Sequence, residues 1–291
     1  MARSIRKQLG VLFPSKRRRV KQSEEHYTES RRRRLEGGRT VVWFSCGATS
    51  AVAAKLAIMR YDGTRDVRIC YCDTGSEHPD NARFLRDCEE WFGREVEILR
   101  SAEYRDIWDV YRRTRYLVGV RGARCTVELK KKMRQQYEQI ASDIQVFGLV
   151  AVEADRVARF RQNNPEMYLE TPLIDRGLDK ADCLAIIEKS GIEIPMMYRL
   201  KFNHSNCVPC VKGQQGYWNK IRKAFPEAFE RMSAMEQELG VAINKTYRGG
   251  ERTRVFLKDL PENAGNYDDE PDISCGLGCG EVMRELEECE A

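Results

Sequence analysis

The sequence lacks a long hydrophobic run. None of its 291 residues lies in a stretch approaching the roughly 20 consecutive apolar residues that cross a bilayer, so no membrane association is expected. The segment 1–39 also lacks the apolar stretch that forms the centre of a secretory signal. We therefore expect a cytoplasmic protein in a reducing environment.

A reducing environment also argues against a disulfide framework for the eleven cysteines. Cysteines used in that setting point to metal binding or catalysis instead. Several lie in apolar strand or helix patterns and are predicted to be core residues, because a buried cysteine behaves as a small hydrophobic side chain: Cys70, Cys72, Cys88 and Cys183.

Charge is distributed unevenly along the chain. Residues 1–39 hold 13 Lys and Arg against 4 Asp and Glu, whereas the rest holds 37 against 41. Two runs of consecutive basic residues, 16–19 and 31–34, repel themselves and offer little apolar surface, so segment 1–38 is predicted to be a disordered basic arm. Such an arm is either a solubilising tail or a contact to nucleic acid phosphates.

Strand-like and helical patterns alternate through the first half of the body. Short β-branched or apolar runs predict strands at 40–44, 67–71, 96–99 and 144–150, with helices at 51–59, 79–91 and 126–137 between them. This alternation predicts an α/β fold, with a parallel twisted sheet covered by helices on both faces. We expect this α/β domain to span 39–175, a helical Cys-rich region 176–257, and an acidic tail 258–291.

The loop after the first strand has the character of an anion site. In Ser45-Cys46-Gly47-Ala48-Thr49-Ser50 the loop opens a helix, whose N-terminal N–H groups attract anions. Gly47 permits close backbone approach, and the hydroxyls of Ser45, Thr49 and Ser50 can donate to phosphate oxygens. The sequence does not fit the Walker loop, which needs Gly-Lys-Ser/Thr. A tight packing turn is the simpler alternative.

A second polar segment, Asp73-Thr74-Gly75, follows the second strand. Ligands in parallel sheets bind beyond the carboxyl ends of the strands, where both loops are expected to lie. An ordinary β-turn with Asp as its turn former would explain the same residues.

Two cysteine clusters have metal-like spacing: Cys207-Val208-Pro209-Cys210 and Cys275-Gly276-Leu277-Gly278-Cys279. Four thiolates could close a tetrahedral zinc site or hold a 4Fe–4S cluster, and the spacing leaves both open. Lys130 lies in the predicted basic helix at 126–137, and Arg156 and Arg159 follow the fourth predicted strand. These basic residues suit an anionic ligand, although solvated helix faces would also explain them.

In their order these motifs resemble the phosphoadenosine phosphosulfate (PAPS) reductase family within the PP-loop superfamily, compact members of which occur in bacteriophages. The resemblance covers roughly 40–215, plus Cys275-Gly276-Leu277. Cys46 replaces a glycine and Thr49 the acid of the PP-loop, and only Cys125 is present where iron–sulfur members carry a cysteine pair.

The resemblance implies an adenine nucleotide, ATP or a phosphosulfate, at the loop around Ser45, Cys46, Gly47, Thr49 and Ser50 and at Asp73, Thr74 and Gly75. It also implies Lys130, Arg156 and Arg159 at the phosphate or sulfate, a cluster or zinc at Cys125, Cys207, Cys210 and Cys279, and Cys275 as the nucleophile.

The sequence leaves three functions open. The first is reduction of a phosphosulfate nucleotide by a thiol, with a thioredoxin-like partner. The second is an ATP-dependent sulfurtransferase or modification enzyme acting on tRNA or DNA, with the basic arm as a nucleic-acid contact. The third is a non-catalytic nucleotide- or metal-binding interaction protein, favoured if Cys46 has abolished turnover. The oligomeric state is left open, so an oligomer stays compatible with the sequence.

Overall fold

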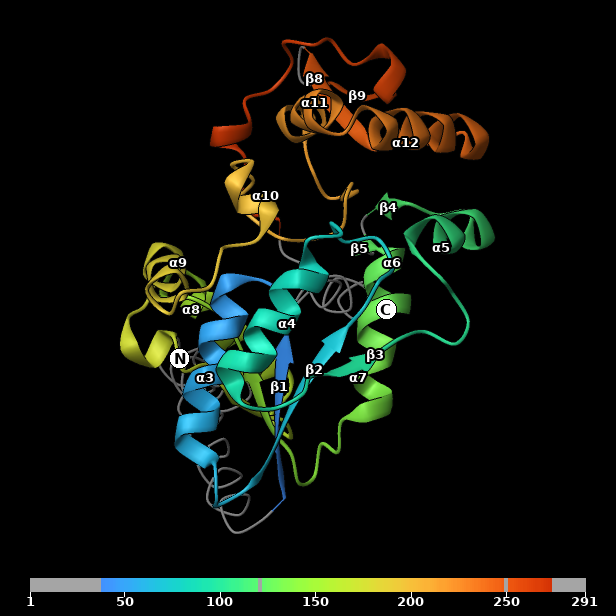
Figure 1. Cartoon of the computed structure of the whole chain (residues 1–291). Helices are drawn as coiled ribbons and strands as arrows, with labels where there is room; N and C mark the ends of the chain where they lie inside the picture. The colour runs from blue at the N-terminus through green and yellow to red at the C-terminus, as the bar shows by residue number, and fades with distance from the viewer. Residues whose placement is uncertain (1–37, 120–121, 249–250, 274–291) are drawn as a thin grey trace, which may run out of the picture.

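A five-stranded parallel sheet forms the centre of the protein (Figure 1). The computed structural model describes residues 38–119, 122–248 and 251–273. The sheet has the order β3-β2-β1-β6-β7, with β1 at Arg39–Phe44, β2 at Asp66–Cys72, β3 at Glu97–Leu99, β6 at Ile144–Phe147 and β7 at Tyr168–Glu170. The predicted α/β fold class is confirmed.

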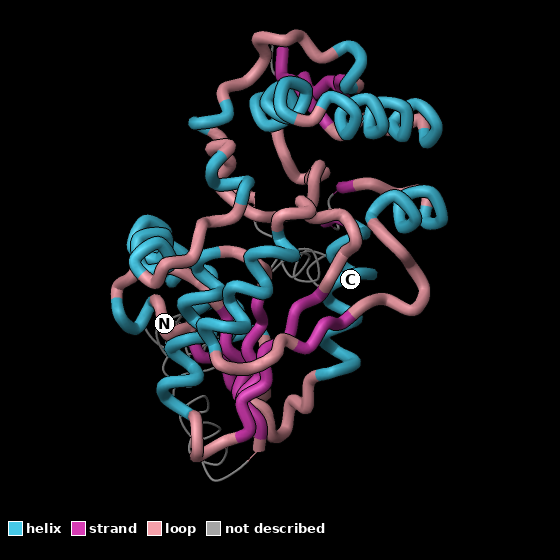
Figure 2. The backbone as a smooth tube through the Cα atoms, viewed as in Figure 1, coloured by secondary structure: helices cyan, strands magenta, loops and turns pink. Residues whose placement is uncertain are grey.

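Strand β1 lies in the middle of the sheet, and its residues alternate between two cores. Val42 and Phe44 point to one face, and Val41 and Trp43 to the other, as the two-residue period of a strand requires. Both faces are apolar because helices cover both (Figure 2). The strand order reverses at β1, which places a topological switch point between β1 and β6.

Helices from distant parts of the chain cover the two faces. The first face packs against α3 (Ala48–Tyr61), α4 (Asn81–Phe92) and α9 (Lys180–Lys189). The second packs against α7 (Lys132–Tyr137) and α8 (Ala154–Asn163). The segment after 175 thus contributes a helix, α9, to the α/β body.

A separate hydrophobic core lies beyond the carboxyl ends of the strands, at the top of Figure 1. It is built around α5 (Ile107–Thr114), α11 (Gln215–Ala224) and α12 (Pro226–Leu239). Pro226 stands at the first position of α12, where the missing N–H of proline costs no helical hydrogen bond. The shorter elements are β4 (Val118–Gly119), β5 (Gly122–Ala123), α6 (Arg124–Thr126), a π-helix (Val127–Lys131), α10 (Met196–Arg199) and a hairpin of β8 (Asn244–Arg248) and β9 (Glu251–Val255).

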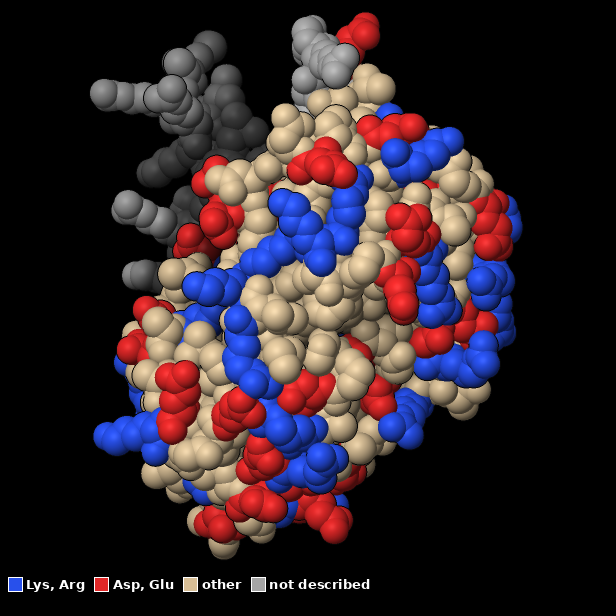
Figure 3. All heavy atoms as spheres, turned by 45° about the horizontal axis from the view of Figure 1, so that its top comes forward, with Lys and Arg blue, Asp and Glu red and all other residues tan. Residues whose placement is uncertain are grey.

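None of the helices in the described ranges combines the length and the apolar composition that crossing a bilayer requires. On the surface, Figure 3 shows a band of Lys and Arg side chains across one face, with Asp and Glu on both sides of it. The predicted basic arm up to residue 37 and the end of the acidic tail beyond Ile273, with its three cysteines Cys275, Cys279 and Cys289, lie outside the described residues.

A buried carboxylate ties α12 to the segments that follow it. Glu236 has no exposed surface, and its two oxygens accept the backbone N–H groups of Ile243 at 2.6 Å and Leu257 at 2.5 Å. Burial raises the pKa of Glu236 to about 7, although the two N–H bonds act in the opposite direction.

We predict that Glu236 makes stability depend on pH. Its pKa lies above the ordinary value of 4.5, so the native state holds the proton more tightly, and this stabilisation is lost as pH rises through about 7. The free energy of unfolding of the wild type relative to E236Q, measured by urea melts, should fall between about pH 5 and pH 7.5. Glu238→Gln, on an exposed position, is the control and should run parallel to the wild type. Parallel curves for E236Q would contradict the prediction.

Candidate functional site

The loop between β1 and α3 is held in an unusual backbone conformation. Cys46 has a backbone φ of +52°, a value that residues other than glycine rarely adopt. Its thiol is fully buried in the core of the first face. Burial also raises the pKa of the Cys46 thiol well above its usual value. The Cys46 side chain therefore packs into the core and supports the loop, and its thiol does not point towards the cavity side of the loop.

Ser50, in the first turn of α3, closes this loop. Its hydroxyl accepts the backbone N–H of Ser45 at 3.0 Å and of Gly47 at 3.4 Å, and it donates to the Gly47 carbonyl at 2.9 Å. The side-chain oxygens of Ser45 and Ser50 are 3.1 Å apart. The side chain of Ser50 thus maintains the loop geometry, while Ser45 is the exposed hydroxyl of the pair.

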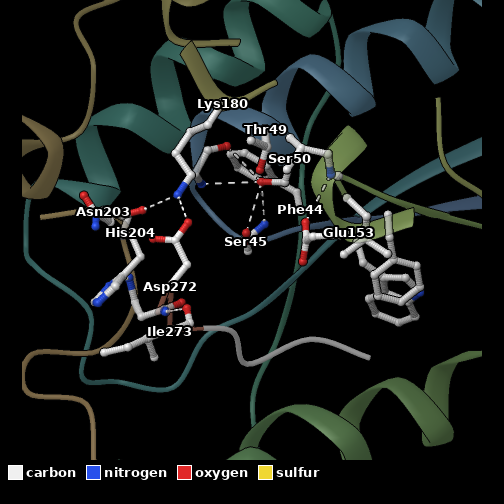
Figure 4. A pocket seen from close by; sticks show the side chains of 18 of the residues that line it. Phe44, Ser45, Thr49, Ser50, Glu153, Lys180, Asn203, His204, Asp272 and Ile273 are labelled. Atoms are coloured by element: carbon white, nitrogen blue, oxygen red, sulfur yellow. Dashed lines mark hydrogen bonds and ion pairs between the residues drawn. The ribbon is translucent and has the colours of Figure 1, made fainter. Parts of the chain in front are cut away.

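The loop forms one wall of a cavity of about 380 Å³ at the switch point of the sheet (Figure 4). Gly148, after β6, lies against the start of α3, where an added Cβ would come within 2.6 Å of the Ser50 backbone. The cavity opens where the loops of β1 and β6 part. An apolar wall is contributed by Trp43, Phe44, Phe147, Leu149 and Val150.

Four basic side chains line the cavity and come from four different elements: Lys130, Arg134, Arg156 and Lys180. Each has a defined setting. The Arg134 guanidinium lies 5.3 Å from the centre of the Phe147 ring, and Arg156 pairs with Glu153 at 2.9 Å. Because only two carboxylates, Glu153 and Asp272, are among the lining residues, the cavity carries an excess of positive charge and favours an anion.

The chain near residue 272 crosses the cavity beside residues 203–206. Lys180 donates to the carbonyl of Asn203 at 3.0 Å and pairs with Asp272, as Figure 4 shows. Asn206 donates to the carbonyl of Ile273 at 2.9 Å. These contacts fasten the last described residues to the cavity wall.

Tyr198, on α10, reaches the N-terminus of α3. Its buried hydroxyl hydrogen-bonds to the backbone N–H of Ala48, and burial raises the pKa of the phenol. A Cβ at Gly47 would lie 3.1 Å from the same hydroxyl, so glycine at this position lets Tyr198 approach. One of the first N–H groups of the helix is therefore already bound by this chain.

A second, much smaller cavity of about 10 Å³ brings three cysteines together: Cys125, Cys207 and Cys210. The hydroxyl oxygen of Thr74 is 3.0 Å from the sulfur of Cys207. The hydroxyl of Tyr111 donates to the sulfur of Cys125 at 3.3 Å. Thr126 also lines this cavity. Among the described residues, no three His, Cys, Asp or Glu side chains stand close enough to hold a metal ion as they are arranged.

Lys130 lines both cavities. It is carried by the π-helix that follows Cys125, a rare form that occurs mostly as single turns, frequently at functional sites. Glu128 in the same turn is buried and pairs with Arg124 at 2.6 Å and with Lys132. The Lys130 ammonium is 3.8 Å from a carboxylate oxygen of Glu77. The cysteines and the basic cavity are thus neighbours that share one lysine.

The structure places the site residues predicted from the sequence in different settings. Those lining the larger cavity are Ser45, Gly47, Thr49, Ser50, Lys130 and Arg156. Thr74 turns to the cysteines instead. Cys46 is buried in the core beneath the loop, and Arg159 lies on an exposed part of α8. Asp73 and Gly75 form a turn. The Asp73 carboxylate accepts the N–H of Gly75 at 2.8 Å and pairs with Arg100 at 2.7 Å. Cys275 and Cys279 lie outside the described residues.

Several lining residues escape sequence reasoning: Cys72, Arg134, Lys180, Tyr198, His204 and Asp272. Cys72 is buried, as its strand pattern predicts, but it also forms part of the cavity wall, where burial raises the pKa of its thiol to about 11 against the influence of Lys130 and Arg134. His204, which precedes the Cys207–Cys210 motif in the chain, is buried, with an exposure of 7%. The basic residues at 130–132, just before Arg134 in the same predicted helix, are the one sequence signal that points towards it.

Two of the solved structures that are similar to this chain are a reductase and a tRNA thiolase. No protein-family model and no curated protein matches the chain. A phosphoadenylyl-sulfate (PAPS) reductase from Candida auris, solved as a phosphate complex, is 12% identical, covers 57% of this chain and 81% of its own, and has a TM-score of 0.42. The U34-tRNA thiolase NcsA from Methanococcus maripaludis with its 4Fe–4S cluster is 15% identical, covers 77% of this chain and 81% of its own, and has a TM-score of 0.42.

The first of these structures is a PAPS reductase, the kind of protein that the sequence motifs resemble. At TM-scores this low, neither similarity carries an argument about what this chain binds or does. Its function must therefore be inferred from its own residues, and neither similarity bears on a phage origin.

Ser50→Ala should open the loop. The change leaves the N–H groups of Ser45 and Gly47 without their acceptor, which costs about 1–3 kcal/mol of stability and loosens the anion-binding wall. We expect a lower melting temperature and, by calorimetry with ATP and with adenylyl sulfates, roughly tenfold weaker binding of whichever nucleotide the wild type takes. Ser190→Ala removes a hydroxyl bond at the exposed end of α9 and should leave nucleotide affinity unchanged. Equal affinities for both variants would show that the loop does not bind the nucleotide.

Proposed function

We propose that the chain is an adenine-nucleotide-binding enzyme of sulfur chemistry, which uses a thiol to reduce a phosphosulfate nucleotide. One observation supports this above all others. A cavity with an excess of basic side chains lies at the helix N-terminus that follows β1, directly beside a group of three cysteines. An anion site and sulfur ligands in contact, through the shared Lys130, suit a reaction at a sulfate attached to a nucleotide.

The cavity offers separate surfaces for the two parts of a nucleotide. The phosphates would bind at the first turn of α3, near the Ser45 and Thr49 hydroxyls, with Arg156 on the opposite side. The adenine would pack against the apolar wall at Phe147 and Leu149, beside the Arg134 guanidinium. Lys130 and Lys180 would contact the sulfate. Thr74 would act at the cysteines, and roles for Asp73, Gly75 and Arg159 stay predictions.

Cys275 is the proposed nucleophile, and chain length supports it. Asp272 and Ile273 line the cavity, and Cys275 follows Ile273 by two positions, a distance of at most about 7 Å along the chain. Its thiolate would attack the sulfate sulfur, and the sulfur–oxygen bond to the nucleotide would break with both electrons leaving on the phosphate.

The product of that step is a thiosulfonate on Cys275. A thioredoxin-like dithiol would attack the cysteine sulfur and release sulfite, and its second thiol would then free Cys275. The dithiol becomes a disulfide while the sulfate sulfur is reduced, so the electrons balance. The basic environment of the cavity would hold the thiolate form of the nucleophile.

A cluster or metal bound by Cys125, Cys207 and Cys210 is the part of the proposal that needs rearrangement. Three thiols on one cavity are the right donors for an iron–sulfur cluster or zinc. A cavity of about 10 Å³ holds no more than one water molecule, and the three thiols are not arranged to bind a metal ion. The cavity would therefore have to widen and the thiols to turn towards a common centre to admit a cluster. When bound, it would supply redox or sulfur-transfer chemistry beside Lys130. Cys279 is the candidate fourth ligand.

The three-cysteine cavity also favours a second function, an ATP-dependent sulfurtransferase acting on tRNA or DNA. In that reaction the nucleotide cavity would bind ATP, and the neighbouring cysteines would take part in delivering sulfur to the activated base. The basic arm at 1–38 is then the candidate contact to nucleic acid.

Product analysis distinguishes the two reactions. With PAPS or adenylyl sulfate and reduced thioredoxin, the wild type should release sulfite and Cys275→Ser should release none, because the nucleophile is gone. Cys88→Ser, in the core of the first face, is the control and should keep activity. Pyrophosphate release from ATP that depends on added RNA or DNA would favour the sulfurtransferase. Neither product, with nucleotide still bound, would favour a non-catalytic binding protein.

Anaerobic purification tests the cysteine site separately. Wild-type protein with a cluster should be brown and contain iron and acid-labile sulfide, and Cys207→Ser should lose both, because one of three clustered ligands is missing. Cys183→Ser, buried on α9 in the core of the first face, should keep both. Colourless protein with stoichiometric zinc would replace the cluster by zinc, and metal-free protein with full activity would remove the site from the mechanism.

A further inference from the structure

The hydroxyl of Tyr198 covers the backbone at the N-terminus of α3, in the wall of the nucleotide cavity. A helix N-terminus binds phosphate through N–H groups that have no partner within the helix. A protein group that already occupies such an N–H therefore limits which phosphate groups the helix end can hold.

Two hydroxyl groups of the chain bind three N–H groups of the loop between β1 and α3. The Ser50 hydroxyl accepts the N–H of Ser45 at 3.0 Å and that of Gly47 at 3.4 Å. The Tyr198 hydroxyl hydrogen-bonds to the N–H of Ala48. A phosphate oxygen could reach any of these donors only by displacing a hydroxyl group.

The same tyrosine fills the space above Gly47. A Cβ added at Gly47 would lie 3.1 Å from the Tyr198 hydroxyl oxygen, so no phosphate oxygen fits between the two. Gly47 and Ala48 are buried, whereas the neighbouring hydroxyl residues are accessible, Ser45 fully and Thr49 in part. The loop therefore presents two side-chain hydroxyls, rather than its backbone, to a ligand.

Tyr198 is fastened in this position through α10. The Met196 N–H donates to the Asp80 carboxylate at 2.7 Å, and Arg83 binds the same carboxylate at 2.7 Å. Met197 is fully buried in the separate core around α5, α11 and α12, whereas the Tyr198 ring packs against the core of the first face. Because neighbouring residues of α10 are anchored in two cores, the hydroxyl is a fixed part of the cavity wall.

The group that covers the Ala48 N–H is uncharged. Burial raises the pKa of the Tyr198 phenol, so the side chain keeps its proton at physiological pH. A neutral oxygen thus occupies a position at the positive end of the helix, where the charged oxygen of a phosphate would be stabilised more strongly.

We propose that Tyr198 determines the class of nucleotide, because it leaves room at the α3 N-terminus for one phosphate and excludes the triphosphate of ATP. The inference rests on the proposed nucleotide cavity and narrows its substrate. The single phosphate lies at the hydroxyls of Ser45 and Thr49, as in a nucleoside monophosphate or its anhydride with sulfate. A triphosphate has further charged groups, and the loop backbone that could hold them is occupied.

Calorimetry with AMP and with ATP on the full chain, without divalent cations, tests the effect of a single atom. Tyr198→Phe removes the hydroxyl oxygen and exposes the Ala48 N–H. ATP should bind about tenfold more tightly to Y198F than to the wild type, because an N–H bond to a charged acceptor is worth roughly that factor. AMP, whose phosphate stays at Ser45 and Thr49, should change by no more than about twofold.

Tyr61→Phe is the matched control. Tyr61 is buried at the other end of α3, donates to Glu170 at 2.6 Å and does not line the nucleotide cavity. Its variant loses the same atom and should leave both affinities unchanged, and melting temperatures check that both variants are folded. A second measurement needs no variant: wild-type protein should bind ATP no more tightly than AMP, although ATP carries more negative charge.

Two results would overturn the inference alone. One is a ratio of ATP to AMP affinity that is the same in Y198F, Y61F and the wild type. The other is a wild type that binds ATP about tenfold more tightly than AMP. Neither result affects the sulfite assay with adenylyl sulfate. A wild type that binds no adenylate would instead contradict the nucleotide cavity itself, and would overturn the proposed function together with this inference.

Discussion

The ion pairs of the buried Glu128 determine how the basic cavity and the three-cysteine cavity are positioned relative to each other. Glu128 is buried and holds Arg124 and Lys132 on either side of a π-helical turn. That turn presents Lys130 to the basic cavity and to the cysteines at once. Arg124 and Lys132 are 45% and 42% exposed, whereas Glu128 has no exposed side-chain surface, so the two cations compensate the buried charge of this carboxylate. The geometry that joins the basic cavity to the cysteines is therefore set by a side chain that lines neither of them.

The α/β core could be predicted from the sequence because its signals are local. The apolar runs around Val42 and Ile69 and the helices between them have unambiguous periods, and these periods lead to the sheet and its parallel direction. The edge strand β7 and helix α5 escaped prediction. β7 has only three residues, Tyr168–Glu170, and α5 has eight, Ile107–Thr114, so neither shows a sustained periodic pattern. The packing of α9 into the first core is a tertiary choice that no local pattern records.

The candidate site was predictable only where one loop supplies it. The Ser45–Ser50 motif carries its own geometry, and most of its residues line the cavity. Lys180, Tyr198 and Asp272 come from segments far apart in the chain, and their meeting depends on how the second core is placed over the sheet. Thr74 shows the converse difficulty. Thr74 follows β2 at the carboxyl end of the sheet, as expected, yet its hydroxyl faces Cys207 and not the basic cavity. The backbone conformation of the turn at Asp73 to Gly75 decides this direction.

The left-handed backbone of Cys46 links loop shape to core volume. Holding a non-glycine residue at a φ of +52° costs on the order of 1–3 kcal/mol, and the fully buried side chain supplies the compensating contacts. The buried Cys46 side chain thus anchors the loop to the core. A substitution in the core that changed the space around the Cys46 side chain would shift the backbone of Ser45 and Gly47, which line the cavity, although none of the altered atoms would touch a ligand. Affinity for an anion could in this way drift through changes in the interior alone.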